Sequence, residues 1–102
     1  MLYAIVDIET TGSYAAGSGI TDIAIIIHDG REILHSWQSL INPHRTIPRF
    51  IQQLTGITDE MVAGAPAFAE VAAHTHSLLH DKIFVAHNVN FDYSFVKYHL
   101  EN

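Results

Sequence analysis

Two apolar runs near the N-terminus constrain the fold of this 102-residue chain more than any other feature. Residues 2–8 are almost continuously apolar, which predicts a strand covered on both faces. Residues 20–28 contain five isoleucines and predict a second strand. Asp29 and Gly30 then predict a hairpin turn into a third strand over residues 32–41. These three strands are expected to form an antiparallel meander.

Helical signals dominate the second half of the chain. Pro48 and Gly56 predict the start and the end of a short helix over residues 48–54. Thr58 predicts the cap of a further helical turn that runs through Met61 and Val62. Residues 66–80 carry apolar side chains at helical spacing, which predicts an amphipathic helix.

The last elements decide the fold class. Residues 83–86 predict a short buried strand, and residues 88–90 predict the cap of a helix from about residue 91 to the end. A helix that crosses over between the third and fourth strands favours a mixed sheet. The sequence therefore predicts an α/β fold, a mixed sheet flanked by helices.

Composition and charge exclude several classes of protein. The chain contains no cysteine, which excludes a disulfide framework and a thiolate zinc site. No apolar run reaches the roughly 20 residues that span a bilayer, and the N-terminus does not read as a signal peptide, so we expect a soluble, cytoplasmic protein. The net charge of −6 argues against a nucleic-acid partner unless bound metal ions supply positive charge.

Asp7 and Glu9 form the first candidate site. They lie two residues apart at the end of the first strand, so their side chains leave the same face. Two close carboxylates repel each other, and a divalent cation with oxygen ligands, Mg²⁺ or Mn²⁺, would compensate that repulsion. The ordinary alternative is that Asp7 begins and caps a turn. An EF-hand loop is excluded because Ser18 occupies the position that requires glutamate.

Asp92 is the second candidate. It falls in the first turn of the last helix, where a negative charge also interacts favourably with the helix dipole. Asn88 or Asn90 would serve as an ordinary N-cap. A fourth strand that enters the sheet beside the first would bring Asp92 over Asp7 and Glu9.

The two segments together resemble a known family. Asp-Ile-Glu-Thr-Thr-Gly at residues 7–12 and His-Asn-Val-Asn-Phe-Asp at residues 87–92 resemble the first two motifs of the DnaQ-like (DEDD) exonucleases. That superfamily includes the proofreading epsilon subunit of bacterial DNA polymerase III. Residues 41–43 and 54–62 are similar to the segment that links the motifs, so the resemblance covers essentially the whole chain.

The resemblance implies a ribonuclease H-like fold with a five-stranded sheet, and a 3′–5′ exonuclease that uses two Mg²⁺ or Mn²⁺ ions. Asp7 would bridge the two ions, Glu9 would bind the first, and Asp92 would hold the second. One ion would make hydroxide available and the other would stabilise the leaving 3′ oxygen. The residues implied to bind the terminal nucleotide or to shape its site are Thr10, Thr11, Gly12, Asn88 and Phe91.

The family also has a third motif, His-x₄-Asp or Tyr-x₃-Asp, after the second. No such motif follows Asp92, where His99 is the one histidine and no aspartate comes after it. We therefore expect residues 1–102 to be the N-terminal part of an exonuclease domain, truncated before the last strand and the third-motif helix. Loss of the water-activating base would slow such a chain by roughly 10²–10⁴-fold. An open sheet edge would favour self-association.

Three alternatives remain open from the sequence. The substrate is expected to be a single-stranded or frayed 3′ end of DNA, with an exoribonuclease as the alternative. A non-catalytic, polymerase-associated binding module is the alternative of another class. His76 and His80, with Asp81 nearby, are interpreted as solvent-facing, and a zinc pair at this spacing is the less favoured reading.

Overall fold

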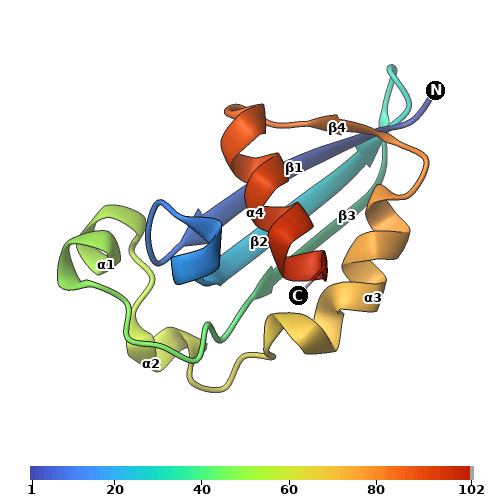
Figure 1. The fold of residues 1–102 in the computed structure, drawn as a ribbon. Coiled ribbons are helices and arrows are strands. Elements are labelled where there is room, and N and C mark those ends of the chain that lie inside the picture. The colour runs from blue at the N-terminus through green and yellow to red at the C-terminus, as the bar shows by residue number, and fades with distance from the viewer. Residues whose placement is uncertain (102) are drawn as a thin grey trace.

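The computed structural model describes residues 1–101 as a single sheet with helices (Figure 1). The four strands lie in the order β3-β2-β1-β4, with β1, β2 and β3 antiparallel and β4 parallel to β1. The predicted meander and mixed sheet are confirmed, with four strands in the described residues. The elements are β1 (Tyr3–Thr10), the 3-10 helix η1 (Ala15–Gly17), β2 (Ile20–His28), β3 (Ile33–Leu40), α1 (Arg49–Thr55), α2 (Asp59–Val62), α3 (Phe68–Leu79), β4 (Ile83–Val85) and α4 (Val89–Glu101).

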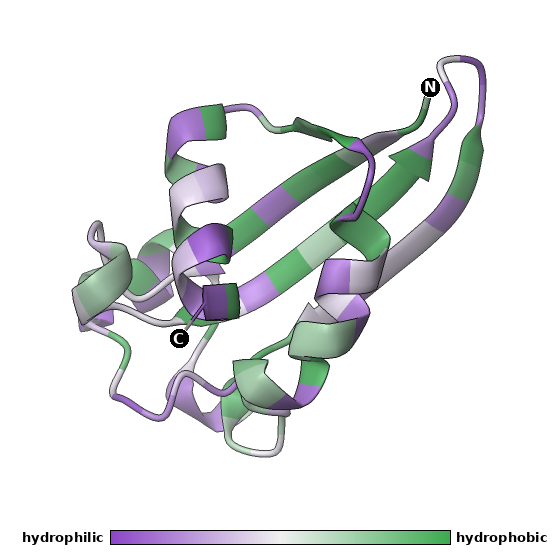
Figure 2. Ribbon diagram, turned by 45° about the vertical axis from the view of Figure 1, so that its right-hand side comes forward, coloured by the Kyte–Doolittle hydropathy of each residue, from purple (hydrophilic) through white to green (hydrophobic). Residues whose placement is uncertain are grey.

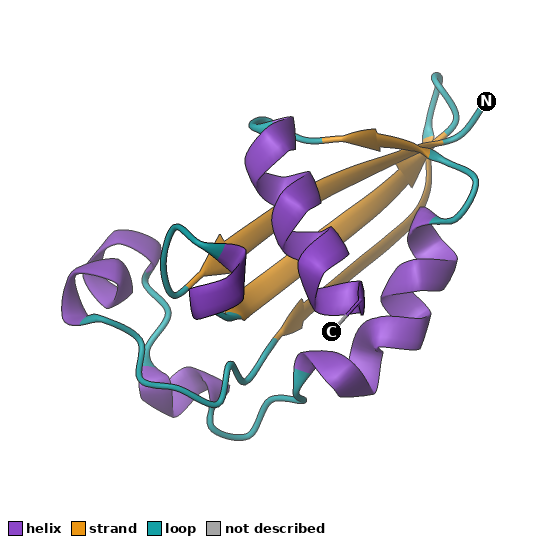
Figure 3. Ribbon diagram, in the orientation of Figure 1, coloured by secondary structure: helices purple, strands orange, loops and turns teal. Residues whose placement is uncertain are grey.

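Strand β1 is covered on one face. Ala4, Val6 and Ile8 are buried against a core that includes residues of α3 and α4, which lie on the same side of the sheet (Figure 3). On the other face, Ile5 is 37% exposed and Asp7 is exposed. The prediction that the first strand is covered on both faces is therefore wrong. Hydrophobic residues occur along much of β1 and β2, although only one face of the sheet receives α3 and α4 (Figure 2).

Strand β4 is shorter and more exposed than predicted. It comprises three residues, and Ile83 and Val85 are 42% and 37% exposed. Both project to the uncovered face of the sheet, whereas Phe84 packs against the core. The register pairs β4 with β1 only as far as Ile5. Beyond Ile5, this edge of β1 has no strand partner among residues 1–101.

The turn between β2 and β3 is stabilised by Asp29. One carboxylate oxygen of Asp29 accepts the backbone N–H groups of Arg31 and Glu32, each at 2.8 Å. Gly30 has a φ of 94°, a conformation that glycine adopts without strain. The predicted hairpin is therefore confirmed, with a loop longer than a two-residue turn.

The helix boundaries follow the predicted signals closely. Gly56, with a φ of 77°, ends α1, and the Thr58 hydroxyl accepts the Met61 N–H at 3.2 Å to cap α2. Helix α4 begins at Val89, two residues earlier than predicted, because the Asn88 carbonyl already accepts the Asp92 N–H at 3.1 Å.

Within residues 1–101, the buried apolar side chains form two clusters. The main core lies between the sheet and the helices α3 and α4, while Ile47, Ile57 and Val62 form a small separate cluster near α1 and α2. Helix α1 itself contains no fully buried residue. Within residues 1–101, no helix is long and apolar enough to cross a membrane.

Candidate active site

Asp7 and Glu9 project from the uncovered face of β1, at the end where the strand finishes. Asp22 lies directly across from Glu9 on β2 and adds a third carboxylate to this face. The Gln38 side-chain amide donates a hydrogen bond to Asp22. Asp22 was not predicted from the sequence as part of this site, although the antiparallel pairing of the first two strands places it opposite Glu9.

Asp92 reaches the same end of β1 from the first turn of α4. Its side chain is buried, with 7% exposed, and its carboxylate interacts with the backbone N–H of Ile8. That N–H is accessible because β4 stops opposite Ile5. Because the fourth strand is short, the edge of β1 beside Ile8 stays unpaired, and Asp92 occupies this place.

The acidic side chains lie close enough to perturb one another. Burial raises the pKa of the Glu9 carboxyl, and the charges of Asp7, Asp22 and Asp92 raise it further. Burial also raises the pKa of Asp92, with Asp7 as the next cause, although the backbone N–H of Ile8 opposes the shift. The folded chain therefore concentrates negative charge that a cation would neutralise.

The donor set fits a hard divalent ion in an open site. Carboxylate oxygens suit Mg²⁺ and Mn²⁺, and Mg²⁺ commonly binds one or two carboxylates together with waters and substrate phosphates. Across residues 1–101, no group of three histidine, aspartate or glutamate side chains is arranged so that it could hold a metal ion by itself. Water and a substrate phosphate would have to complete the coordination.

We expect the Asp92→Asn variant to be more stable than the wild type in metal-free buffer at pH 7, by about 1 kcal/mol. The raised pKa means that the folded state disfavours the ionised carboxyl. The contribution of Asp92 to the free energy of unfolding is therefore greatest below the ordinary pKa of 3.8 and falls as pH rises through the raised value. Urea denaturation at pH 4 and pH 7 measures the difference. Asp81→Asn, at an exposed side chain, is the matched control; equal stability of Asp92→Asn and wild type at pH 7 would contradict the expectation.

The two threonines of the first motif shape its turn. The Thr10 hydroxyl donates to the Gly12 carbonyl at 2.7 Å, and the Thr11 hydroxyl accepts the Gly19 N–H at 3.0 Å. Both side chains are buried. A Cβ atom at Gly12 would lie 2.7 Å from the Ser18 hydroxyl, so a larger residue at this position would require the Ser18 side chain to move. The threonine hydroxyls are thus engaged within the protein, and residues 10–13 line an adjacent hollow.

That hollow has a volume of about 350 Å³ and lies between the first motif and α1. Glu9 and the turn over residues 10–13 form one wall, with Phe50, Leu54 and Phe91 contributed by the helices. Phe50 is 69% and Leu54 81% exposed. Neither residue was predicted as part of the site, because their exposure depends on how α1 packs, which the sequence does not show. Asn88 is exposed at the start of α4.

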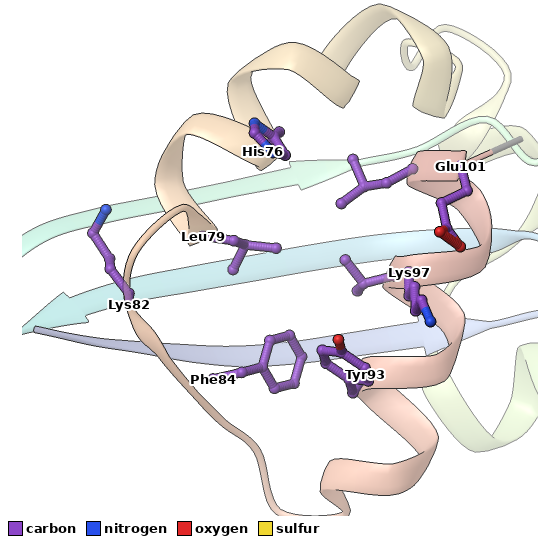
Figure 4. A pocket seen from close by; sticks show the side chains of 9 residues that line it. His76, Leu79, Lys82, Phe84, Tyr93, Lys97 and Glu101 are labelled. Atoms are coloured by element: carbon purple, nitrogen blue, oxygen red, sulfur yellow. The ribbon is translucent and has the colours of Figure 1, made fainter.

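A larger hollow, about 440 Å³, lies elsewhere, between α3, β4 and α4. Figure 4 shows Phe84 beside Tyr93 there. Their rings pack edge to face, with centroids 5.3 Å apart. None of the three candidate metal ligands lines it. The carboxylates, rather than the size of a cavity, therefore locate the candidate active site.

The histidines of α3 lie away from the carboxylates. His76 and His80 are exposed, as predicted, with ring centroids 5.5 Å apart, and His80 is 3.3 Å from Asp81. They precede β4, whose first residue pairs with Tyr3 at the start of β1. The carboxylates are at the opposite end of that strand, so these histidines are not placed to act on the same site.

A family model described as an exonuclease, of the RNase T type, matches residues 4–102. The chain belongs to this exonuclease family. The resemblance to the DEDD exonucleases is thereby confirmed.

Curated relatives of this exonuclease chain are much longer proteins. The 3′–5′ exonuclease DinG of Bacillus subtilis (strain 168) is 42% identical over 99 residues, which are 96% of this chain and 11% of that protein. DinG of Staphylococcus haemolyticus (strain JCSC1435) is 42% identical over 100 residues, 98% of this chain and 11% of that protein. The exonuclease chain thus spans about a tenth of the length of these relatives.

Solved structures show the same fold. Exonuclease X in complex with 5′ overhanging duplex DNA is 31% identical, with a TM-score of 0.75 over 88% of this chain and 51% of that one. A zinc-ion-bound complex of E. coli exonuclease I with single-stranded DNA is 22% identical, with a TM-score of 0.84 over 94% of this chain and 22% of that one. The exonuclease chain therefore has the predicted ribonuclease H-like fold.

Proposed function

We propose that this chain carries the metal-binding part of a 3′–5′ exonuclease that hydrolyses the terminal phosphodiester of DNA. The observation that carries the proposal is the convergence of Asp7, Glu9 and Asp92 at the carboxyl end of β1. They come from two elements far apart in the sequence, and their mutual repulsion disfavours a purely structural role. The names of the DinG relatives support the direction of hydrolysis.

Each carboxylate has a place that suits one role. Asp7 contributes to the raised pKa of both Glu9 and Asp92, so it is the residue placed to bind both of two ions. Glu9 lines the hollow beside the first motif and would bind an ion near the substrate, and Asp92 would bind an ion at the free edge of β1. When bound, such ions lower the pKa of water and stabilise the leaving oxygen.

The hollow beside the first motif would receive the terminal nucleotide. Nucleobases stack on apolar and aromatic side chains whatever their sequence, and Phe50 and Leu54 offer such a surface opposite the turn of residues 10–13. Bound cations would supply the positive charge that a chain of net charge −6 lacks. The DNA complexes of the similar exonucleases support DNA as the substrate, and an exoribonuclease is the alternative.

The test compares 5′-labelled DNA and RNA oligonucleotides of one sequence, incubated with excess protein and Mn²⁺. We expect DNA products that shorten from the 3′ end, and no reaction in EDTA. Single-turnover conditions, with protein in excess, make slow hydrolysis measurable. Faster shortening of RNA would select the alternative substrate. Binding of Mn²⁺ without hydrolysis of either strand would favour a non-catalytic binding module.

Replacing Phe50 with alanine is expected to weaken oligonucleotide binding about tenfold, within the range of roughly 1–3 kcal/mol for loss of one base-stacking contact. Fluorescence anisotropy with a single-stranded DNA and Ca²⁺ measures the affinity. Phe50→Trp keeps an aromatic surface and should bind as the wild type does. Ile33→Ala removes an exposed apolar side chain from β3 and is the control. Equal weakening by Phe50→Ala and Ile33→Ala would refute the assignment.

A further inference from the structure

Helix α4 carries two polar residues on its inward face. Asp92 is in its first turn, and His99 follows seven residues later, which is close to two helical turns. Between them, Phe95 and Val96 are buried, with 1% and 2% exposed. The face of α4 that packs Asp92 against β1 therefore also packs His99 toward the loop that contains η1.

The imidazole of His99 is held among aromatic rings and backbone. Its ring stacks on that of Phe95 with the centroids 6.0 Å apart, and its centroid lies 5.9 Å from that of Phe68 in α3. Its Nε2 atom is buried and has no hydrogen-bond partner in the described structure. The ring interacts with the backbone of Ser18, while burial lowers the pKa of His99. A neutral imidazole has a single N–H to donate, and Ser18 is the partner that the fold offers.

Ser18 stands directly behind the first motif. Its hydroxyl lies 2.7 Å from where a Cβ atom of Gly12 would be. Its neighbour Gly19 exchanges two hydrogen bonds with Thr11, from the Gly19 N–H to the threonine hydroxyl at 3.0 Å and from the Thr11 N–H to the Gly19 carbonyl at 2.9 Å. Residues 18 and 19 thus contact the turn of residues 10–12 and hold it by hydrogen bonds to Thr11.

The same loop is held from a second direction. The Arg45 guanidinium donates a hydrogen bond to the Gly17 carbonyl. A hollow of about 230 Å³ separates this part of the loop from α3, and both Arg45 and His99 line it. Gly19 itself packs closely against Pro43, where an added Cβ atom would lie 2.7 Å from the proline Cβ, so close packing and polar contacts together hold this part of the loop.

We infer that His99 is a positioning residue of the candidate active site: through Ser18 it fixes the turn that carries Thr10, Thr11 and Gly12. A phenylalanine at position 99 would keep the aromatic stacking but could not donate to Ser18. Because α4 also carries Asp92, this contact holds the first motif in a fixed position relative to Asp92. The effect on metal binding rests on the proposed function, whereas the effect on the loop does not.

Backbone amide hydrogen exchange, measured by NMR on the metal-free protein, tests the inference. In His99→Phe, we expect exchange at Thr11 and Gly19 to accelerate about fivefold, the effect of one ordinary hydrogen bond. The core amides of Ile23 and Ile25 report global opening and should change less. His99→Gln retains an N–H donor and should restore much of the protection. His76→Phe, at an exposed position on α3, is the matched control and should leave Thr11 and Gly19 unchanged.

Two results would overturn the inference. One is equal acceleration at Thr11, Gly19 and the core amides, which would make His99 a packing residue. The other is unchanged exchange at Thr11 and Gly19 in His99→Phe. A Mn²⁺ titration of the same variants then measures whether loosening the turn weakens metal binding. Because the exchange experiment contains neither metal nor substrate, its outcome stands even if the chain hydrolyses no nucleic acid.

Discussion

Replacing Asp7 with asparagine is expected to reduce the affinity of this chain for Mn²⁺ by at least ~100-fold, because even residues that only orient a metal ligand contribute 10–100-fold. Asp7 is the carboxylate that perturbs both of the others, through its charge on Glu9 and on Asp92. Without it, Glu9 on β1 and Asp92 on α4 lose the carboxylate that interacts with both of them. Isothermal titration calorimetry at pH 7 measures the loss.

The control for Asp7→Asn must remove the same charge elsewhere. Asp29→Asn is unsuitable because the Asp29 carboxylate holds the hairpin turn. Asp81→Asn removes one negative charge at an exposed position remote from the site, and it should leave Mn²⁺ affinity unchanged. If Asp7→Asn binds Mn²⁺ as tightly as Asp81→Asn does, the candidate metal site is refuted.

The largest effect on stability is expected for Phe95→Ala, which should lower the free energy of unfolding by about 3–5 kcal/mol. Domains of this size are commonly stable by only 5–15 kcal/mol, so the variant should be close to unfolding. Phe95 is 1% exposed, packs against Phe91 at 4.8 Å and stacks on His99 at 6.0 Å. Its ring belongs to the core between α4 and the sheet.

Urea denaturation followed by circular dichroism measures this change. Phe95→Leu keeps most of the apolar volume and should lose less than about half as much, since volume-conserving changes are tolerated best. A loss of under about 1 kcal/mol in Phe95→Ala would show that the core collapses around the cavity or that α4 contributes little to stability.

The parts of the fold that follow from local patterns were predictable from the sequence. The isoleucine-rich run and the Asp29-Gly30 turn are enough to predict the meander, because register and turn depend on neighbouring residues. The crossover helix then requires a fourth strand parallel to another. The placement of Asp92 near Asp7 follows from that topology.

Features that depend on distant packing were not predictable. Over residues 3–6 both faces of β1 carry apolar side chains, so the sequence could not show that α3 and α4 both lie on one side. Phe50 and Leu54 read as ordinary helix residues until α1 is seen to leave them exposed beside the first motif. The link from His99 to Ser18 joins segments about eighty residues apart, and no spacing rule connects them.

The three-residue length of β4 sets a limit on how this sequence can vary. Because β4 stops opposite Ile5, the Ile8 N–H stays free for Asp92. A residue inserted between Val85 and Asp92 would either extend the pairing toward that N–H or rotate α4 by about 100° per residue, turning Asp92 away from β1. A residue inserted at Gly30 would disturb the turn that Asp29 holds, but this turn is exposed and lies away from the carboxylates. Deletions and insertions should therefore accumulate in the hairpin, while the distance from β4 to Asp92 stays constant.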